Sequence, residues 1–391
     1  MSDLLKKFDG LLKDTGPAAI VLKQWLKPVG SEVFFPPTYA NPSQKKGDAP
    51  VYNIDRFGST KVSFEFRNKD RNQELTLDAA KVESDREHSV CVVDSIPSQA
   101  NRIEPAFGRL KNSKGESVTL VPKVVINAKV DGEDVTVNLL DAGHRAADAV
   151  IKFSSLGKEL AGVIASRRKG DSGPLAKLAP TSLVFGMWDS RGDGGVKVPR
   201  LLNSIIRAYD VLEHRRSSQF NPAMDFEAAG VTTDPKDKKL SEVGMDGAPA
   251  TFQHGGIEAR GGICRDASVN LCTLRDIVSG NTEKTVALQR YVLGLTLVAM
   301  TYFDGKALNL RQGCQLVAVQ EKPMTRILVN ADGTEDPFAI DRDLALEYAK
   351  AAADAFGIGP DHIDAAFDVK AAKASRKKTD KDKTEEKGGN S

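Results

Sequence analysis

The sequence predicts an α+β protein built on a ferredoxin-like fold, and three segments of its C-terminal half lead to this prediction. Residues 263–272 alternate between two sets of side chains, one mainly apolar and one mainly polar, which is typical of a strand. Residues 282–301 are a long apolar stretch with helical spacing, and short strands are predicted at 315–320 and 325–330. A strand, a helix and two further strands in this order make up half of a ferredoxin-like fold.

The remaining elements follow from local patterns, taken in chain order. We expect an amphipathic helix at 4–12, strands at 18–29, 62–67 and 90–93, a weak helix at 74–84, and a helix at 98–110 capped by Ser98. Strands at 118–129 and 135–140 flank Asp131–Gly132, a strong hairpin signal. Helices are predicted at 144–151, 156–168 and 344–356, and a strand at 181–188, whereas 201–212 fits either a helix or a strand.

Two polar segments interrupt or follow this pattern. Residues 217–256 are rich in Pro, Gly, Asp and Lys and predict a long insertion that is mostly loop. Residues 370–391 hold eight Lys or Arg and four Asp or Glu, a net charge of 8 − 4 = +4, with no aromatic residue. This composition predicts a disordered basic tail, so that residues 1–369 form a single elaborated domain.

Composition limits the classes of function. The chain has 391 residues, of which 40% are hydrophobic, and a formal net charge of only +2, so a site for a polyanion has to be local. The four cysteines are widely spaced without a C-x-x-C pair, which favours a reducing cytoplasm over a disulfide framework or a zinc site. No apolar run reaches the roughly 18 residues of a membrane span. We therefore expect a cytoplasmic protein that does not bind membranes.

The segment Pro180–Gly192, PTSLVFGMWDSRG, has the chemistry of a polyanion contact. Trp188 is expected to be exposed, and Ser190 and Arg191 lie in a turn rich in glycine. Arginine pairs with phosphate, and glycine lets the backbone approach a ligand closely. The alternative is an ordinary hairpin turn with a half-buried tryptophan.

A second segment, DAGHRAADA, places Asp141, His144, Arg145 and Asp148 within two helical turns. His144 and Asp148 are four residues apart and can form an acid–base pair on one helix face. Two alternatives stay open: a helix N-terminus capped by Asp141, with Arg145 paired to Asp141 or Asp148, or contact of His144 and Arg145 with RNA. The histidine spacing and the glycine runs match no metal or nucleotide motif, so we expect no metal and no cofactor.

Seven blocks of the sequence resemble, in their order along the chain, one protein family. The blocks are SQANRIE (98–104), LLDAGHRAADAV (139–150), PTSLVFGMWDSRG (180–192), SIIRAYDV (204–211), SSQFNP (217–222), HGGIEARGGICRDA (254–267) and LRQGCQLV (310–317). The family is the backbone subunit of type I-U, also called I-G, CRISPR Cascade interference complexes, in the RAMP superfamily. The similarity extends over roughly residues 35–320.

The resemblance implies a modified ferredoxin-like (RRM-like) palm with long insertions and a thumb-like hairpin. The insertion 217–256 is the first candidate for the thumb, and the glycine turn 192–195 is the second. The resemblance also implies a non-catalytic subunit that binds guide RNA (crRNA) and presents it to target DNA. Copies of the subunit would stack head-to-tail with one another and with other Cascade subunits. The competing hypotheses are a RAMP-type endoribonuclease using His144 with Asp141 or Asp148, and a small-molecule-binding protein.

Polar, aromatic and charged residues in these segments are the candidates for RNA contact. They are Gln99, Arg102, His144, Arg145, Trp188, Ser190, Arg191, Arg200, Arg207, His254 and Arg265. Arg102, which follows Gln99 and Asn101, is the best phosphate candidate of the first half. Because no RNP1-type aromatic signature is present, we expect contacts to the RNA backbone rather than base stacking on a sheet.

Overall fold

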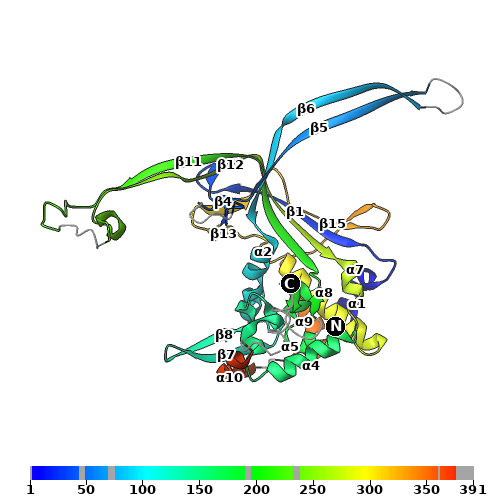
Figure 1. Ribbon diagram of the computed structural model, residues 1–391. Helices are drawn as coiled ribbons and strands as arrows, with labels where there is room; N and C mark the ends of the chain where they lie inside the picture. Colours follow the sequence, from blue (N-terminus) through cyan, green and yellow to red (C-terminus); the bar gives the residue numbers. More distant parts are fainter. Residues whose placement is uncertain are drawn as a thin grey trace, which may run out of the picture.

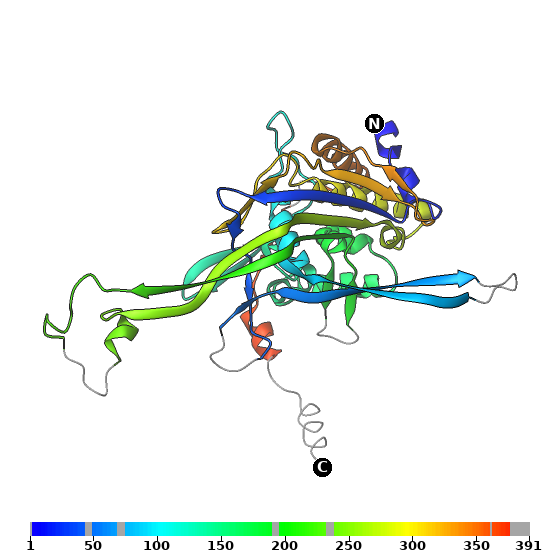
Figure 2. The same ribbon diagram turned by 90° about the horizontal axis from the view of Figure 1, so that it is seen from above.

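The computed structural model describes residues 2–43, 49–68, 75–189, 195–231, 238–359 and 362–375. Its centre is a large antiparallel sheet, which we call the palm sheet, with helices packed on one face (Figures 1 and 2). The strand order is β13 (Leu308–Arg311), β14 (Cys314–Ala318), β1 (Ala19–Pro28), β12 (Ala248–Asn270), β11 (Leu202–Phe220), β6 (Leu75–Asp94) and β5 (Ile54–Asn68). Strand β15 (Thr325–Val329) also pairs with β1 and carries β16 (Glu335–Pro337), and β2 (Val33–Phe34) pairs with β12.

The predicted fold class is confirmed. In chain order β1, helix α2 (Ile96–Ile103), the β11–β12 pair, helix α8 (Thr282–Met300) and β14 follow the β-α-β-β-α-β succession of a ferredoxin-like fold. In the sheet these strands lie in the order β14–β1–β12–β11, so that the first strand sits between the last and the third. The strand pairs β5–β6 and β7–β8 are insertions into this plan.

Helix α8 fills the core beneath the palm sheet. Its C-terminal half, from Tyr291 to Met300, is buried on all sides, and the helix packs between the sheet and α9 (Arg342–Phe356). A Cβ on Gly294 would lie 2.7 Å from the Cα of Ala349, so glycine is what allows this close helix contact. Asn281 caps α8, Asp341 caps α9, and α9 ends at Gly357 in the left-handed conformation. Both helices were predicted within two residues of these ends.

Two long hairpins extend from the palm sheet in different directions (Figure 1). The first arm is the β5–β6 pair, and the second arm is the outer part of the β11–β12 pair, whose ladder continues to Phe220 opposite Ala248. The prediction of a loop at 217–256 is therefore wrong at both ends, because residues 217–220 belong to β11 and residues 248–256 belong to β12. The weak helix expected at 74–84 is also wrong, because pairing with β5 outweighs a small helical preference.

Three more local predictions are corrected. Helix α2 is capped by Ser95, whose Oγ accepts from the Ser98 backbone N–H, and the chain tightens into a 3-10 helix at Glu104–Arg109. The strand expected at 181–188 is mostly a buried helix, α6 (Thr181–Phe185), which begins after Pro180. The helix expected at 144–151 is a 3-10 turn, Arg145–Ala147, followed by α3 (Ala149–Lys152). The ambiguous segment 201–212 lies in β11.

The hairpin predicted around Asp131–Gly132 is confirmed. Strands β7 (Lys123–Val130) and β8 (Glu133–Asn138) pair around these two residues, which both have positive φ, and β17 (His362–Ala366) joins β7 in parallel. The other elements are short or lie on the helical side: α1 (Ser2–Lys6), 3-10 turns at Asp9–Leu12, Leu139–Asp141 and Leu240–Val243, β3 (Thr38–Tyr39), β4 (Val51–Tyr52), α4 (Gly157–Arg168), α5 (Gly173–Leu178), β9 (Met187–Asp189), β10 (Val196–Val198) and α7 (Leu271–Arg275).

The beginning of the predicted tail is helical. Helix α10 (Val369–Ala374) is capped by Asp368, whose carboxylate accepts from the Ala371 backbone N–H. Residues 376–391, the rest of the predicted disordered tail, lie outside the described residues. Within the described part of the chain, no helix is long and apolar enough to cross a membrane.

Candidate nucleic-acid interface

The face of the palm sheet away from the helices is open. Along β1 the side chains of Ile20, Leu22, Gln24 and Leu26 are buried against the helices, and strand alternation therefore places Lys23, Trp25 and Lys27 on the opposite face. The register puts Arg207 and Tyr209 of β11 and Asp266 of β12 on that same face. Figure 2 looks onto this open face, with the helices behind the strands.

Two aromatic side chains flank a glycine pair on the open face. Tyr209 lies opposite Gly262, and Trp25 lies opposite Cys264 two residues further along β12. A Cβ on Gly262 would be 3.1 Å from the Trp25 ring, and one on Gly261 would be 2.9 Å from the Tyr209 Cβ. The two glycines thus make room for the aromatic side chains. Aromatic side chains on a sheet can stack with nucleobases, so this pair departs from the expectation of backbone contacts alone.

Cations surround the aromatic pair. The Lys322 ammonium lies 4.3 Å from the Trp25 ring centroid, and Lys23, Lys27 and Arg207 add three positive charges. Asp266 is the carboxylate among them: it lies 3.8 Å from the Arg207 guanidinium and accepts from the Tyr209 hydroxyl. This set carries four cations against one acid, so the sheet has a local positive charge here although the whole chain is nearly neutral.

On the covered side of the palm sheet, a buried carboxylate at the end of β6 positions two arginines. Asp94 is fully buried and accepts hydrogen bonds from Gln99 Nε2, Arg102 Nε and Arg311 Nη2. The Arg102 and Arg311 side chains are 31% and 24% exposed, so each guanidinium is anchored on one side and reaches the surface on the other. Such a pre-organised arginine is suited to phosphate.

Three of the predicted RNA contacts are corrected, because Gln99, Arg145 and Arg265 are buried. Gln99 bridges Asp94 and the Ser204 hydroxyl, which joins α2 to the sheet. Arg265 is fully buried; it donates to Ser204 Oγ, Gln24 Oε1 and the Met300 carbonyl, and burial lowers its pKa to about 10. These side chains hold the core together and do not face a ligand.

Arg145 pairs with Glu104 and not with either aspartate of its own segment. Its Nε lies 2.7 Å from Glu104 Oε2, its Nη1 donates to the Gly186 carbonyl, and its guanidinium lies 5.2 Å from the Phe185 ring centroid. Burial raises the pKa of the Glu104 carboxyl to about 7, although the Arg145 charge opposes this rise. The pair connects the 3-10 turn at Arg145 to the end of α2 and to α6.

His144 and Trp188 lie together in one cavity of about 900 Å³, with Lys152 and Asp189. Both predicted residues are exposed, His144 at 83% of its side chain and Trp188 at 67%. His144 Nδ1 lies 3.6 Å from Asp148 Oδ2, while Asp148 also accepts from the backbone N–H groups of His144 and Val150. A cap is present, but the predicted residues are wrong: Asp148 and not Asp141 caps α3, and Arg145 pairs with Glu104.

The remaining predicted residues are dispersed. Arg200 donates from Nε to the Phe185 carbonyl beside α6, and His254 lies half-buried against the Tyr52 ring at the base of the second arm. Arg207 lies on the open face. Ser190 and Arg191 are outside the described residues.

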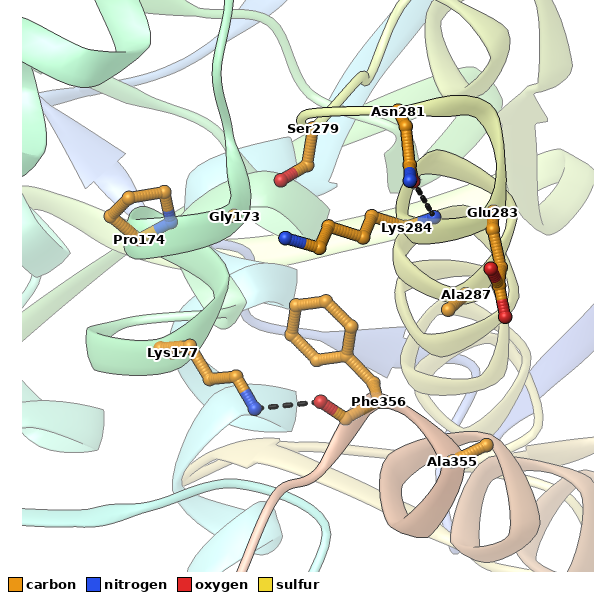
Figure 3. Close-up of a pocket in the computed structure, with 10 residues that line it drawn as sticks. All are labelled: Gly173, Pro174, Lys177, Ser279, Asn281, Glu283, Lys284, Ala287, Ala355 and Phe356. Atoms are coloured by element: carbon orange, nitrogen blue, oxygen red, sulfur yellow. Dashed lines mark hydrogen bonds between the residues drawn. The ribbon is translucent and has the colours of Figure 1, made fainter.

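Another pocket, of about 560 Å³, lies among α5, α8 and α9 on the helical side (Figure 3). Lys177 donates to the carbonyls of Phe356 and Gly357, both at 2.6 Å, and its ammonium lies 4.5 Å from the Phe356 ring centroid. A cation on the last carbonyls of a helix stabilises the helix end. We therefore assign Lys177 the structural role of holding α5 to the end of α9. In the described ranges, no three His, Cys, Asp or Glu side chains are grouped to hold a metal ion.

Fold and face together define a ferredoxin-like α+β protein whose sheet exposes a cationic and aromatic surface. Residues 20–213 match the model of a family described as CRISPR-associated protein GSU0053 (Cas_GSU0053). The match includes the first four of the seven blocks on which the sequence resemblance rests. It supports a CRISPR-associated protein and therefore involvement in a CRISPR system. The comparison with curated proteins gave no match.

Proposed function

We propose that the chain is the non-catalytic backbone subunit of a type I-U/I-G Cascade complex and that it binds guide RNA (crRNA) on the open face. The observation that carries the proposal is the grouping of Trp25, Tyr209, Lys23, Lys27 and Arg207 on the uncovered side of the palm sheet. Single-stranded RNA is bound by surfaces that combine stacking aromatics with cations along the phosphate chain.

In the proposed complex the RNA runs across the strands. Cations hold its phosphates, and the aromatic pair supports one or two bases without selecting them. The other bases face outward and pair with target DNA, so that pairing and not the protein reads the sequence. This arrangement needs no cofactor and no metal, and it agrees with a cytoplasmic location.

The arms supply contacts beyond a single subunit. In the proposal the second arm is the thumb, and it reaches a neighbouring copy in a head-to-tail array, because a heterologous contact that does not close gives a helical filament. Other Cascade subunits would end the array. The first arm, of which the sequence predicted only the strand at 62–67, is a further candidate for the same role.

An endoribonuclease is the alternative function, and one observation favours it. His144 and Asp148 are 3.6 Å apart in a cavity that also holds Trp188 and Lys152. Against it, Asp148 already accepts from two backbone N–H groups as a helix cap. We expect no cleavage of RNA or DNA by the purified chain, with or without magnesium. Cleavage products that disappear in the His144→Ala variant would favour the endoribonuclease hypothesis over the non-catalytic backbone subunit.

The test of the proposed function is RNA content and RNA affinity. Chain purified from cells that express its CRISPR array should carry short RNA of uniform length, detected by ultraviolet absorbance and ribonuclease digestion. The double variant Trp25→Ala, Arg207→Ala should lose RNA affinity by at least about tenfold, as expected for one stacking contact and one phosphate contact. Arg168→Ala, on the exposed side of α4, is the matched control. Purified chain that carries no RNA, or an Arg168→Ala variant that loses as much RNA affinity as the double variant, would contradict the proposal.

A further inference from the structure

The pocket of about 560 Å³ among α5, α8 and α9 lies on the helical side of the molecule, away from the open face (Figure 3). Two lysines, a hydroxyl and a carboxylate surround the Phe356 ring in its lining: Lys177, Lys284, Ser279 and Glu283. A pocket of this volume is large enough for a small organic molecule, and two cations against one acid make it positive.

Lys284 lies where a positive charge is unfavourable for the fold. It is exposed in the first turn of α8, and the N-terminus of a helix carries a partial positive charge. A Cβ on Gly280, which has φ +54°, would lie 3.2 Å from Lys284 Cδ, so the lysine side chain folds back across the turn before the helix. Its ammonium points across the pocket toward α5 (Figure 3) and forms no ion pair with a residue of the described ranges. An anion in the pocket would supply the missing negative charge.

The Ser279 hydroxyl is rigidly placed and has no partner. Only 8% of the residue is exposed, its backbone N–H donates to Thr285 Oγ1 at 3.0 Å, and its carbonyl accepts from the same hydroxyl at 3.0 Å. Ser279 Oγ points into the pocket (Figure 3), and no residue that the structure describes forms a hydrogen bond with it. A Cβ on Gly173 would lie 2.4 Å from this oxygen, so glycine leaves the space beside it open. A polar group buried to this extent usually has a partner, and here a ligand can provide it.

The wall formed by α5 and α9 adds a fixed charge and an aromatic ring. Lys177 is anchored on the carbonyls at the end of α9, so its ammonium stays at one point beside the pocket. The Phe356 ring stacks on Tyr291, with the ring centroids 5.1 Å apart and the planes inclined by 15°, and also lines the pocket. The Glu283 side chain points away from the Lys284 ammonium (Figure 3). Cations beside an aromatic ring suit a ligand in which phosphate is joined to a planar group.

We propose that this pocket binds a small phosphate ester of the size of a mononucleotide. The phosphate lies on Lys284, the Ser279 hydroxyl and the N-terminus of α8, and the planar group lies against Phe356. A helix N-terminus with a lysine and a hydroxyl is a general arrangement for holding phosphate. Inorganic phosphate alone would leave most of the pocket empty, which is why the ligand includes a second group. This inference goes beyond the proposed function and does not depend on it, because the pocket and the open face lie on different sides of the palm sheet.

The test compares three probes by isothermal titration calorimetry on the full chain: adenosine monophosphate, inorganic phosphate and adenosine. Adenosine monophosphate should bind at least about tenfold more tightly than either of the others, because each of them lacks one half of the ligand. Lys284→Ala should weaken the binding of adenosine monophosphate at least about tenfold, and Ser279→Ala about three- to tenfold. Lys158→Ala, which removes an exposed lysine from the first turn of α4, is the matched control and should leave binding unchanged.

Two further measurements separate ligand binding from other roles of Lys284. Without ligand, Lys284→Ala should melt at no lower temperature than the unchanged protein, because the substitution removes a cation from a helix N-terminus. Its affinity for RNA should also be unchanged. A chain that does not bind adenosine monophosphate, equal weakening in Lys158→Ala, or a Lys284→Ala variant that loses stability or RNA affinity while it still binds adenosine monophosphate would each overturn the pocket. Absence of RNA binding, in contrast, would overturn the proposed function and leave the pocket standing.

Discussion

The covered and open faces of the palm sheet each carry an arginine, and the two residues are neighbours in the ladder. Arg265 of β12 lies opposite Ile206, and Arg207 lies opposite Cys264, one step further along. Arg265 is fully buried, whereas the Arg207 side chain is 39% exposed. Because successive side chains of a strand point to opposite faces, a shift of one residue moves a guanidinium from the core to the surface.

The difference shows that place in the pleat, not residue type, decides the role of an arginine here. Arg265 donates to a hydroxyl, an amide and a helix carbonyl, and its guanidinium lies 5.0 Å from the Phe303 ring centroid. It joins the end of α8 to three strands. Arg207 has the Asp266 carboxylate 3.8 Å away and keeps much of its guanidinium in solvent. The first is suited to stability and the second to a ligand.

Removing the Arg265 side chain from the covered face should have the largest effect on stability. Arg265→Ala removes three hydrogen bonds and leaves both a cavity and buried polar partners, including Ser204 and Gln24. We expect the free energy of unfolding to fall by about 3–5 kcal/mol. Urea denaturation followed by circular dichroism measures it. A loss below about 1 kcal/mol would show that the buried arginine is dispensable and would remove the contrast between the faces.

The buried pair of Arg145 and Glu104 predicts how the stability of the protein depends on pH. Burial raises the pKa of the Glu104 carboxyl to about 7 in the folded protein, above its value in the unfolded chain. The folded state therefore binds this proton more tightly, and the stability that the group contributes is present at low pH and lost as pH rises toward and through 7. Between pH 5 and pH 8 this contribution should fall by about 2 kcal/mol.

Glu104→Gln is the matched variant for this prediction, since glutamine keeps the shape and removes the titration. Subtracting its unfolding free energy at each pH from that of the unchanged protein isolates the carboxyl. A difference that stays flat from pH 5 to pH 8, or grows in favour of the unchanged protein as pH rises, would contradict the assigned direction of the pKa shift.

Changing the open side should have the smallest effect on stability. Arg207→Ala removes a half-exposed side chain, so the unfolding free energy should change by less than about 0.5 kcal/mol. RNA affinity should fall about three- to tenfold, and the dependence of binding on salt should become shallower by about 0.7 for one lost phosphate contact. Titrations at several salt concentrations measure both. Unchanged RNA affinity would show that Arg207 does not contact an RNA phosphate.

The sequence predicted the elements that depend on local pattern. Helix α8, strand β1 and the hairpin at Asp131–Gly132 follow from apolar spacing and turn chemistry, and all three are present. The arms were predicted only in part: a strand at 62–67 in the first arm and a thumb-like hairpin within 217–256 for the second. Their full length was missed, because it depends on cross-strand pairing between distant segments. A buried helix in place of the strand at 181–188 was missed because a short apolar run fits both structures.

The candidate site was predicted only in part. Exposure of Trp188 followed from its polar and glycine-rich neighbours, but the burial of Arg145 and Arg265 depends on partners far away in the chain. Trp25 was missed although the alternation of charged and apolar residues around it in β1 carried the signal. Which side of a strand faces solvent is decided by where the helices pack, and no local pattern contains that information.

The ladder of the second arm is irregular at three points along its length. Strands β11 and β12 continue from the core into the arm, and the 23 residues of β12 at about 3.3 Å each have a contour length of roughly 75 Å. Register shifts fall between Tyr209 and Val211, Glu213 and Arg215, and Arg216 and Ser218. Bulges bend a paired ribbon and increase its twist, so these three shape the path along which the second arm leaves the palm sheet. Because the same two strands continue into the core, the direction of the second arm is fixed by the part of the palm sheet in which Arg265 is buried.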